Sequence, residues 1–294
     1  MPESTSRSIG GRGSLLRFFM WRALSAAARV FCLAALSLAL AHADPLVIPG
    51  SGSPEIILRE LANAFNAAHP NDRVEVPPSS RSVGGIHAVK SNEVVMARVS
   101  RRPIGEDAAG LRYVAFARDA VVFAAGKTVS VQNLSSARLA DIFSGRVTDW
   151  ASLGLRADPV RVVVGNQTES NVVLIKERLI PFKDIKFPSD AKLAYHAYET
   201  VDLLGKYGSA IGFASLSVLK GATAGVHPLR LDGIAPTAEN VVSGKYPLLI
   251  DYGLVYKEAR LNDTARRFLD FVFSGRGRKV LLDNGLIPLA RKPV

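Results

Sequence analysis

A short apolar run, a Gly/Ser turn and an amphipathic helix follow one another near the start of this chain. The run covers residues 46–48, the turn covers 50–53, and apolar residues at helical spacing predict a helix over 55–68. Ser53 suits the cap of that helix, and Pro54 suits its first position. A helix that begins directly after a strand points unpaired backbone N–H groups into the space above the turn. The sequence therefore predicts an anion-binding turn.

The residues before this unit have the pattern of an export signal. Five arginines lie in the first 29 residues, an apolar core covers 33–40, and Ala-His-Ala at 41–43 is typical of a cleavage site. We expect a signal peptide over 1–43, cleaved after Ala43, and a periplasmic protein that starts at Asp44. Met20 is an alternative start. The other interpretation, a membrane anchor, is disfavoured because the apolar core is far shorter than the ~20 residues that a span needs.

Removal of this segment changes the composition that matters for function. Cys32, the single cysteine, lies within it, so the exported chain has no disulfide and no cysteine metal site. The segment's five arginines and Glu3 account for +4 of the net charge of +11, which leaves +7. The remaining basic residues are scattered and are not interleaved with aromatics. We therefore expect no nucleic-acid partner, while the positive field favours small anions or an anionic surface.

Strand and helix patterns alternate along the rest of the chain, which predicts an α/β fold with largely parallel sheets. Strands are expected at 73–76, 94–100, 113–117, 120–125, 161–164, 210–213 and 248–256. A second unit begins near Gly126, and the chain returns to the first near Tyr246. We therefore predict one lobe from 44–125 plus 246–294 and another from 126–245. Crossings near 124–127 and 243–248 would form a hinge beside a ligand cleft.

The sequence lacks the usual residue patterns of metal sites, catalytic sites and nucleotide-binding sites. The histidines after the signal, at 69, 87, 196 and 227, do not pair at metal-ligand spacing, so no metal site is expected. The sequence has no Gly-x-Ser-x-Gly elbow, no Walker loop and no complete dinucleotide fingerprint. We therefore expect a protein that is not an enzyme and that carries no cofactor.

An ordered set of segments resembles one family over essentially the whole exported chain. The segments include Gly-Ser-Gly-Ser at 50–53, Ser-Val-Gly-Gly at 82–85, Ser-Arg-Arg-Pro at 100–103, Leu-Ala-Asp-Ile-Phe-Ser-Gly at 139–145 and Gly-Leu-Ile-Pro at 285–288. Together they are similar to the phosphate-binding periplasmic proteins of ABC transporters. The resemblance implies the two-lobed periplasmic-binding-protein fold, with a mixed, mostly parallel sheet in each lobe, two hinge crossings and an oxyanion in the cleft.

The resemblance also implies a set of ligand-binding residues. They lie in the turns and helix starts of the family pattern, and they are Ser51, Ser53, Ser82, Arg101, Thr168 and Ser170. Capping alone would also explain the hydroxyl residues. At most one of Arg101 and Arg102 faces the cleft, because neighbours in extended chain point to opposite sides.

The chain departs from the family pattern at several of these turns. Pro54 lacks an amide donor, Val83 replaces a serine, and the arginine of the third turn is absent. Arg101 stands in place of the aspartate that accepts the proton of hydrogen phosphate. An arginine there removes a proton acceptor and adds a cation. We therefore expect selectivity for hydrogen phosphate to be lost in favour of a proton-free anion.

These features predict an exported solute-binding protein that captures a small, phosphate-like anion for an ABC-type importer. Its partners would be that anion and a membrane permease complex, and it would act as a monomer. The alternative is a family-derived module for signalling or surface interaction that binds little or no phosphate. A phosphoesterase-like enzyme is the third interpretation.

Overall fold

The structure is a computed structural model that describes residues 44–195, 197–220 and 225–291, so the predicted signal peptide lies outside the described residues. From Pro45 onward the described chain forms one compact unit. Within the described ranges, no helix combines the length and the apolar character that a membrane crossing requires.

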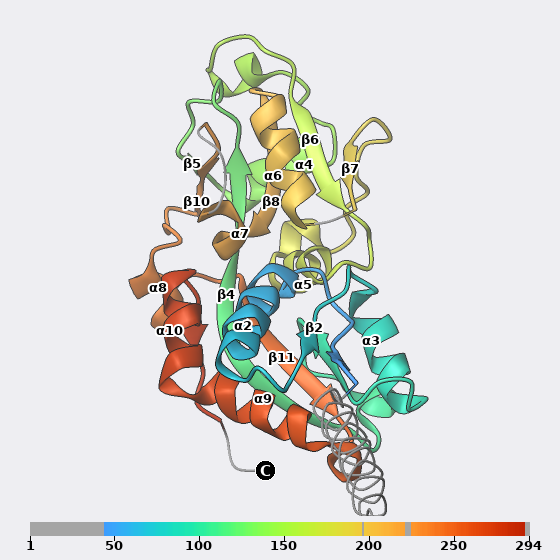
Figure 1. Cartoon of the computed structure of the whole chain (residues 1–294). Coiled ribbons are helices and arrows are strands. Elements are labelled where there is room, and N and C mark those ends of the chain that lie inside the picture. The colour runs from blue at the N-terminus through green and yellow to red at the C-terminus, as the bar shows by residue number, and fades with distance from the viewer. Residues whose placement is uncertain (1–43, 196, 221–224, 292–294) are drawn as a thin grey trace, which may run out of the picture. The chain divides into compact units, whose positions relative to one another are not determined.

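Helices and strands alternate through this unit (Figure 1). The helices are α2 (Glu55–Ala68), α3 (Arg81–Lys90), α4 (Ser136–Phe143), α5 (Ser170–Arg178), α6 (Ala197–Lys206), α7 (Leu216–Lys220), α8 (Ala238–Val242), α9 (Asp263–Phe273) and α10 (Gly275–Asp283). The strands are β1 (Leu46–Val47), β2 (Val74–Glu75), β3 (Met96–Val99), β4 (Arg112–Ala125), β5 (Asn133–Leu134), β6 (Arg161–Gly165), β7 (Lys192–Ala194), β8 (Ala210–Ser215), β9 (His227–Pro228), β10 (Arg230–Leu231), β11 (Leu249–Tyr256) and β12 (Ile287–Pro288). Short 3-10 turns lie at Gly105–Ala108, Trp150–Leu153, Ile180–Phe182 and Glu258–Arg260.

The main sheet is mixed and has the strand order β3-β11-β4-β8-β6-β7, with β9 and β12 also paired to β4. Strand β6 pairs in parallel with β7 and β8, whereas every pair made by β4 or β11 is antiparallel. Two parallel pairs, β1 with β2 and β5 with β10, lie outside this sheet. The predicted mixed α/β sheet is confirmed, but its central strands are antiparallel rather than parallel.

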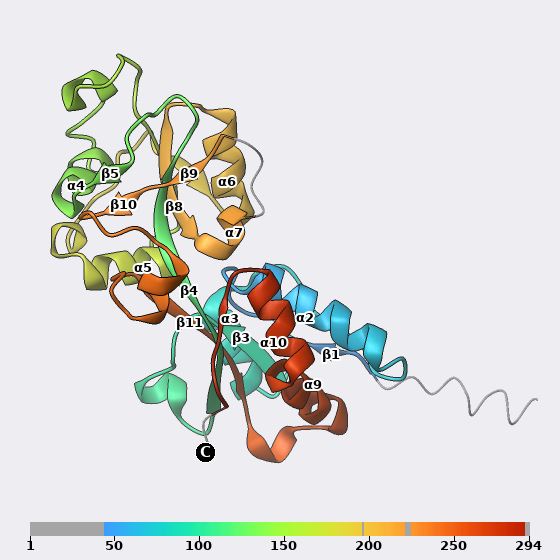
Figure 2. The same ribbon diagram turned by 90° about the vertical axis from the view of Figure 1, so that its left-hand side faces the viewer.

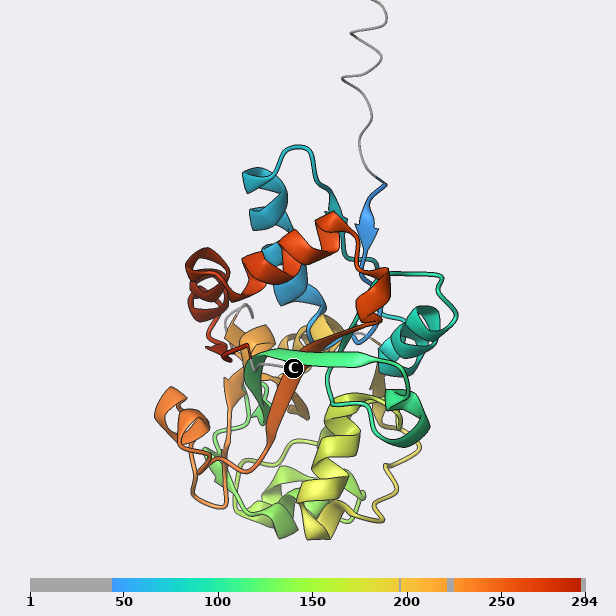
Figure 3. The ribbon, with the colours of Figure 1, turned by 90° about the horizontal axis from the view of Figure 1, so that it is seen from below.

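Two groups of helices cover different parts of this sheet. Helices α2, α9 and α10 pack on one another, and α3 packs on β3 and β11 (Figures 2 and 3). Helices α5, α6 and α7 contact β8 and its neighbouring strands. This is the two-lobed arrangement that the sequence predicts.

Strand β4 joins the two parts of the sheet. Its residues up to Ala120 pair with β11, and its residues from Val121 onward pair with β8. The sequence predicted two strands here, interrupted by Arg118 and Asp119. The prediction of a break was wrong, because Arg118 forms an ion pair within the sheet and Asp119 accepts hydrogen bonds there. Arg118 donates to its register partner Asp251 at 2.6 and 2.9 Å.

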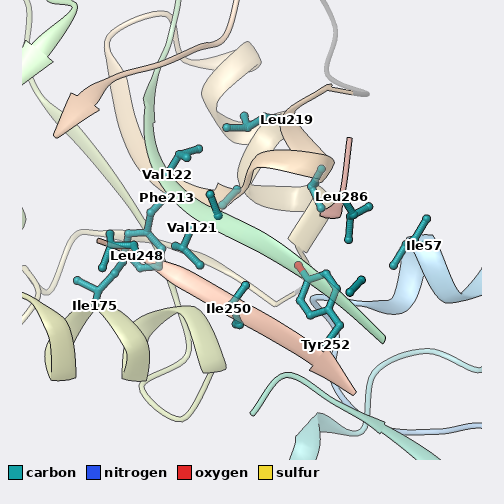
Figure 4. Close-up of a cluster of buried hydrophobic side chains, with 14 of the residues drawn as sticks. Ile57, Val121, Val122, Ile175, Phe213, Leu219, Leu248, Ile250, Tyr252 and Leu286 are labelled. Atoms are coloured by element: carbon teal, nitrogen blue, oxygen red, sulfur yellow. The ribbon is translucent and has the colours of Figure 1, made fainter. Parts of the chain in front are cut away.

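Asp119 is buried at the point where β4 changes partner. Its carboxylate accepts from the Ala120 amide at 2.8 Å, from the Tyr252 hydroxyl at 3.1 Å and from the Ser217 hydroxyl. Around it, Figure 4 shows Val121 and Ile250 from β4 and β11 within one apolar cluster. A continuous core therefore holds the two parts of the sheet together.

Aromatic side chains fill the core beneath each group of helices. Phe123 contacts Phe143 and Phe213 edge to face, with ring centroids 5.5 and 6.0 Å apart. Phe65 contacts Phe268 and Phe271 in the same manner at 5.3 and 5.5 Å. Trp150 is 2% exposed and donates from Nε1 to the Ser209 carbonyl at 2.9 Å. These contacts fix the elements that carry the site.

Candidate functional site

The Gly/Ser turn between β1 and α2 lies directly on strand β3. Gly50 has a φ of 132°, and a Cβ added there would overlap the carbonyl oxygen of Arg98. The next residue, Ser51, donates its amide to that same carbonyl at 3.0 Å. Position 50 therefore needs glycine both for its backbone angle and for this close approach.

The side chain of Arg98 holds the turn from below. It is completely buried, and its guanidinium donates to the carbonyls of Ser51 at 2.7 Å, Pro77 at 2.8 Å and Ile48. Glu55, at 3.3 Å, is its acidic partner. Burial lowers the pKa of Arg98 to about 10, and Glu55 opposes that change. The arginine is therefore still charged at neutral pH and acts as a fixed support for backbone carbonyls.

Three helix starts line one small pocket of about 60 Å³. The residues directly before α2 and the first turns of α3 and α5 meet there, each beside a helix of nine residues or more. This volume suits a small ion and is far below the several hundred Å³ of a typical organic-ligand site. The lining residues include Ser51, Ser53, Ser79, Arg81, Ser82, Gly165, Asn166, Thr168, Glu169, Ser170, Asn171 and Tyr195.

The structure brings together five of the six residues that the sequence selected. Ser51, Ser53, Ser82, Thr168 and Ser170 all line this pocket. The sixth, the exposed Arg101, is not among its lining residues. It lines a separate cavity of about 550 Å³, and Ser170 lies on both.

Two of the serines are already engaged with the neighbouring strand end. The Ser51 and Ser100 hydroxyl oxygens are 2.5 Å apart, and the Ser100 amide donates to Ser82 Oγ at 3.4 Å. Ser82 lies inside α3 and therefore is not its cap, which was one of the expected roles. Ser100 thus links the first two turns of the pocket.

Ser53 does not cap α2, contrary to the prediction. The cap position is Pro54, and no side chain caps the helix. The Ser53 hydroxyl is 4% exposed and has no hydrogen-bond partner. Asn171 also lines the pocket and is 3% exposed, and its amide oxygen likewise has no hydrogen-bond partner. Buried polar atoms are normally satisfied, so these two atoms indicate a place for a polar ligand.

Arg81 is the arginine of this pocket, and sequence reasoning missed it. It has a φ of 63°, and its guanidinium donates to Thr168 Oγ1 at 3.1 Å, which joins the start of α3 to the loop before α5. A left-handed backbone is uncommon for such a residue and is frequent at functional sites. The signal for it in the sequence is its position directly before Ser82, at the start of the predicted helix.

Glu169, which the sequence did not single out as a site residue, also lines the pocket. Its carboxylate lies so close to Gly165 that a Cβ added to that glycine would overlap it. Burial raises the pKa of the Glu169 carboxyl to about 7, and the backbone N–H of Asn171 limits the rise. The pocket therefore contains a carboxyl group that changes charge near neutral pH.

No group of three or more His, Cys, Asp or Glu side chains suited to a metal ion occurs within the described ranges. Among the described lining residues, Arg81 and Glu169 carry the formal charges. The pocket thus offers hydroxyls, helix-start amides and one guanidinium, together with one carboxyl. Such a site can bind a small oxyanion by hydrogen bonds and charge.

Comparisons with known proteins agree with this geometry. The profile of the PBP_like_2 family, a PBP superfamily domain, matches residues 38–276. The phosphate-binding protein PstS of Borreliella burgdorferi is 22% identical over 248 residues, covering 82% of this chain and 88% of that protein. PstS of Bacillus subtilis is 24% identical over 251 residues, covering 83% and 80%.

A solved structure shares the fold over its full length. A putative phosphate ABC transporter substrate-binding protein from Clostridium perfringens, determined with bound phosphate, matches with a TM-score of 0.75 and 25% identity, covering 84% of this chain and 100% of that chain. The family resemblance inferred from the sequence is confirmed: the chain belongs to the PBP superfamily.

Proposed function

We propose that this protein is an exported solute-binding protein that holds a small inorganic oxyanion of the phosphate class and delivers it to an ABC-type importer. The observation that carries the proposal is the convergence of three helix starts, Arg81 and the unpartnered Ser53 hydroxyl on one pocket of about 60 Å³. The names of the relatives, which describe phosphate-binding and substrate-binding proteins, support it.

The site residues of the proposal follow from the pocket. Ser51, Ser53, Ser82, Thr168 and Ser170 contribute hydroxyls, and the amides at the helix starts point at the ligand. Arg81 supplies the positive charge. A guanidinium is well suited to this role because its N–H groups match the spacing of two oxyanion oxygens.

The transport role adds proposals about the rest of the molecule. The signal peptide would be removed after Ala43, and the mature protein would act in the periplasm as a monomer beside a membrane permease. The lobes would comprise residues 44–125 plus 246–294 and residues 126–245. The change of pairing partner along β4 between Ala120 and Val121 supports a crossing in this part of the chain, near the proposed 124–127.

A thermal-shift panel of phosphate, sulfate, molybdate, tungstate and small carboxylates tests the proposal. An anion present at 100 times its dissociation constant should add about 2.7 kcal/mol to the free energy of unfolding. Arg81→Gln should weaken binding of that anion about 10- to 100-fold, which corresponds to the loss of one charge-assisted hydrogen-bonding partner of about 1.5–3 kcal/mol. Arg156→Gln is the matched control, since Arg156 is exposed and does not line the pocket. A flat panel would refute the proposal and favour the interaction module.

A further inference from the structure

A second, larger cavity adjoins the anion pocket. Its volume of about 550 Å³ is in the range of organic-ligand sites, whereas the pocket of about 60 Å³ suits only a small ion. Ser170, at the start of α5, lines both spaces. Ser100 lines the cavity, and its hydroxyl oxygen lies 2.5 Å from that of Ser51, which lines the pocket. A ligand whose head group fills the pocket can therefore extend past these serines into the cavity.

Two unpaired arginines line this cavity. Arg101 follows β3, and Arg178 is the last residue of α5. Neither side chain forms an ion pair or a hydrogen bond with another residue in the part of the chain that the structure describes. Arg118, the third arginine of the cavity, is by contrast paired with Asp251 at 2.6 Å. Two unpaired guanidinium groups on one cavity repel each other, and an anion bound between them relieves that repulsion.

Much of the remaining wall of the cavity is apolar. Val173 and Leu174 line it from α5, and Leu249 and Ile250 line it from β11. A hydrocarbon chain gains free energy by contact with such a wall. A second phosphate group would lose water there without receiving hydrogen bonds in return. The lining therefore favours a ligand with a carbon linker over a chain of condensed phosphates.

One carboxylate of the cavity opposes the binding of an anion. Glu177 lines the cavity and has no partner among the described residues. The two unpaired arginines outweigh it, since two positive charges and one negative charge leave +1. All three side chains are exposed, so solvent screens them and limits each to a modest contribution.

Building on the proposed function, we propose that the anion in the pocket is the head group of a longer ligand, a phosphonate or phosphate monoester whose short carbon chain ends in a carboxylate. The phosphoryl oxygens accept the hydrogen bonds of the helix starts and of Arg81. The carbon chain lies along the apolar wall made by α5 and β11. The carboxylate lies between Arg101 and Arg178. Inorganic phosphate occupies only the pocket and does not contact these two arginines.

Arg101 thereby has a different role from the one that the sequence suggested. The expectation of a proton-free anion depended on Arg101 lying beside the phosphate group. The structure places Arg101 on the neighbouring cavity instead, so that reason for the expectation no longer applies to the head group. A carboxylate is ionised at neutral pH, and a planar guanidinium matches the spacing of its two oxygens.

Calorimetric titration with two series of probes tests the role of the carboxylate. Phosphonoacetate and its homologues one and two carbons longer have both charged ends. Ethyl-, propyl- and butylphosphonate have the same head group and no carboxylate. At the chain length that reaches the arginines, the carboxylate probe should bind about 10-fold more tightly than its alkyl partner, or about threefold for each exposed arginine. An advantage below about twofold at every chain length overturns the inference.

Variants of the two arginines show whether the advantage comes from this cavity. Arg101→Gln and Arg178→Gln should each reduce it to about threefold, and the double substitution should abolish it. Both residues are exposed, so the fold should tolerate these changes. Comparison of the ratio between variants cancels any difference between the free probes. An advantage that survives the double substitution contradicts the proposed position of the carboxylate.

Three further substitutions are matched to these variants. Arg81→Gln should weaken both series of probes alike and leave the ratio unchanged, because Arg81 lines the pocket of the head group. Glu177→Gln should raise the ratio about threefold, since it removes a negative charge from the cavity, and a fall would argue against an anion there. Arg156→Gln alters an exposed arginine that lines neither space and should behave as the unmodified protein does.

Inorganic phosphate distinguishes failure of the inference from failure of the proposed function. Binding of phosphate together with an equal affinity for both series of probes, or with no binding of any phosphonate, overturns the inference and leaves the proposed function intact. Absence of binding of phosphate and of every probe overturns the proposed function, and the inference with it.

Discussion

Replacing Glu169 by glutamine should stabilise the ligand-free protein at alkaline pH and leave it unchanged at acidic pH. Burial raises the pKa of this carboxyl from an ordinary 4.5 to about 7, so the folded state binds a proton that the unfolded state releases. For such a group, stability is highest below the unfolded pKa and falls as the pH rises toward the folded pKa. Glutamine does not titrate and avoids that loss.

The size of the effect follows from the pKa difference. Each pKa unit corresponds to about 1.36 kcal/mol, which gives at most about 3 kcal/mol for Glu169. Glu169 is partly exposed, and solvent at the pocket screens part of this energy, so we expect about 1–2 kcal/mol at pH 8.5. For a chain of this length the gain corresponds to a rise of about 2–8 °C in Tm.

Thermal and urea unfolding at pH 4 and pH 8.5, without phosphate or sulfate, measure this difference. The two proteins should have nearly equal stability at pH 4, should diverge as the pH rises from the unfolded pKa of 4.5 to the folded pKa of about 7, and should keep a constant difference above that. Glu177→Gln, which alters an exposed carboxyl on the same helix, is the control and should show no divergence. An equal stability gap at both pH values would show that the Glu169 carboxyl is not desolvated in the pocket, and would refute the reasoning.

Three further substitutions test the support of the site. Gly50→Ala should cost more than about 2 kcal/mol in urea unfolding, because the new Cβ meets the Arg98 carbonyl and the backbone is left-handed. Arg98→Met should cost about 3–5 kcal/mol and weaken anion binding, since it leaves Glu55 and buried carbonyls without their donor; a loss below 1 kcal/mol contradicts the assigned role. Tyr252→Phe should cost about 1–3 kcal/mol by removing a donor to Asp119, with anion affinity unchanged in calorimetry.

Much of the fold follows from local signals in the sequence. The spacing of Leu58, Leu61 and Phe65 predicts α2 with its observed bounds, and the apolar run that begins at Arg161 predicts β6. Such signals depend on periodicity within a single element. The continuity of β4 did not follow, because Arg118 and Asp119 find their partners on β11 and α7, more than ninety residues away. Local polarity cannot reveal partners at that separation.

The candidate site shows the same division between local and distant information. Hydroxyl residues at helix starts were recognisable, and five of them meet in one pocket. The charged residues Arg81 and Glu169 were not predicted to line the site, because the sequence does not show in which direction a side chain at a turn extends. Arg81 has a left-handed backbone, and its side chain reaches Thr168 in the loop before α5. Arg101 follows β3 into a different cavity.

The pocket combines residues from both groups of helices. Ser53 and Arg81 lie at the starts of α2 and α3, whereas Glu169 and Asn171 lie at the start of α5. The complete set of lining residues therefore comes from segments that are far apart in the sequence, and the periodicity within any single element could not predict it.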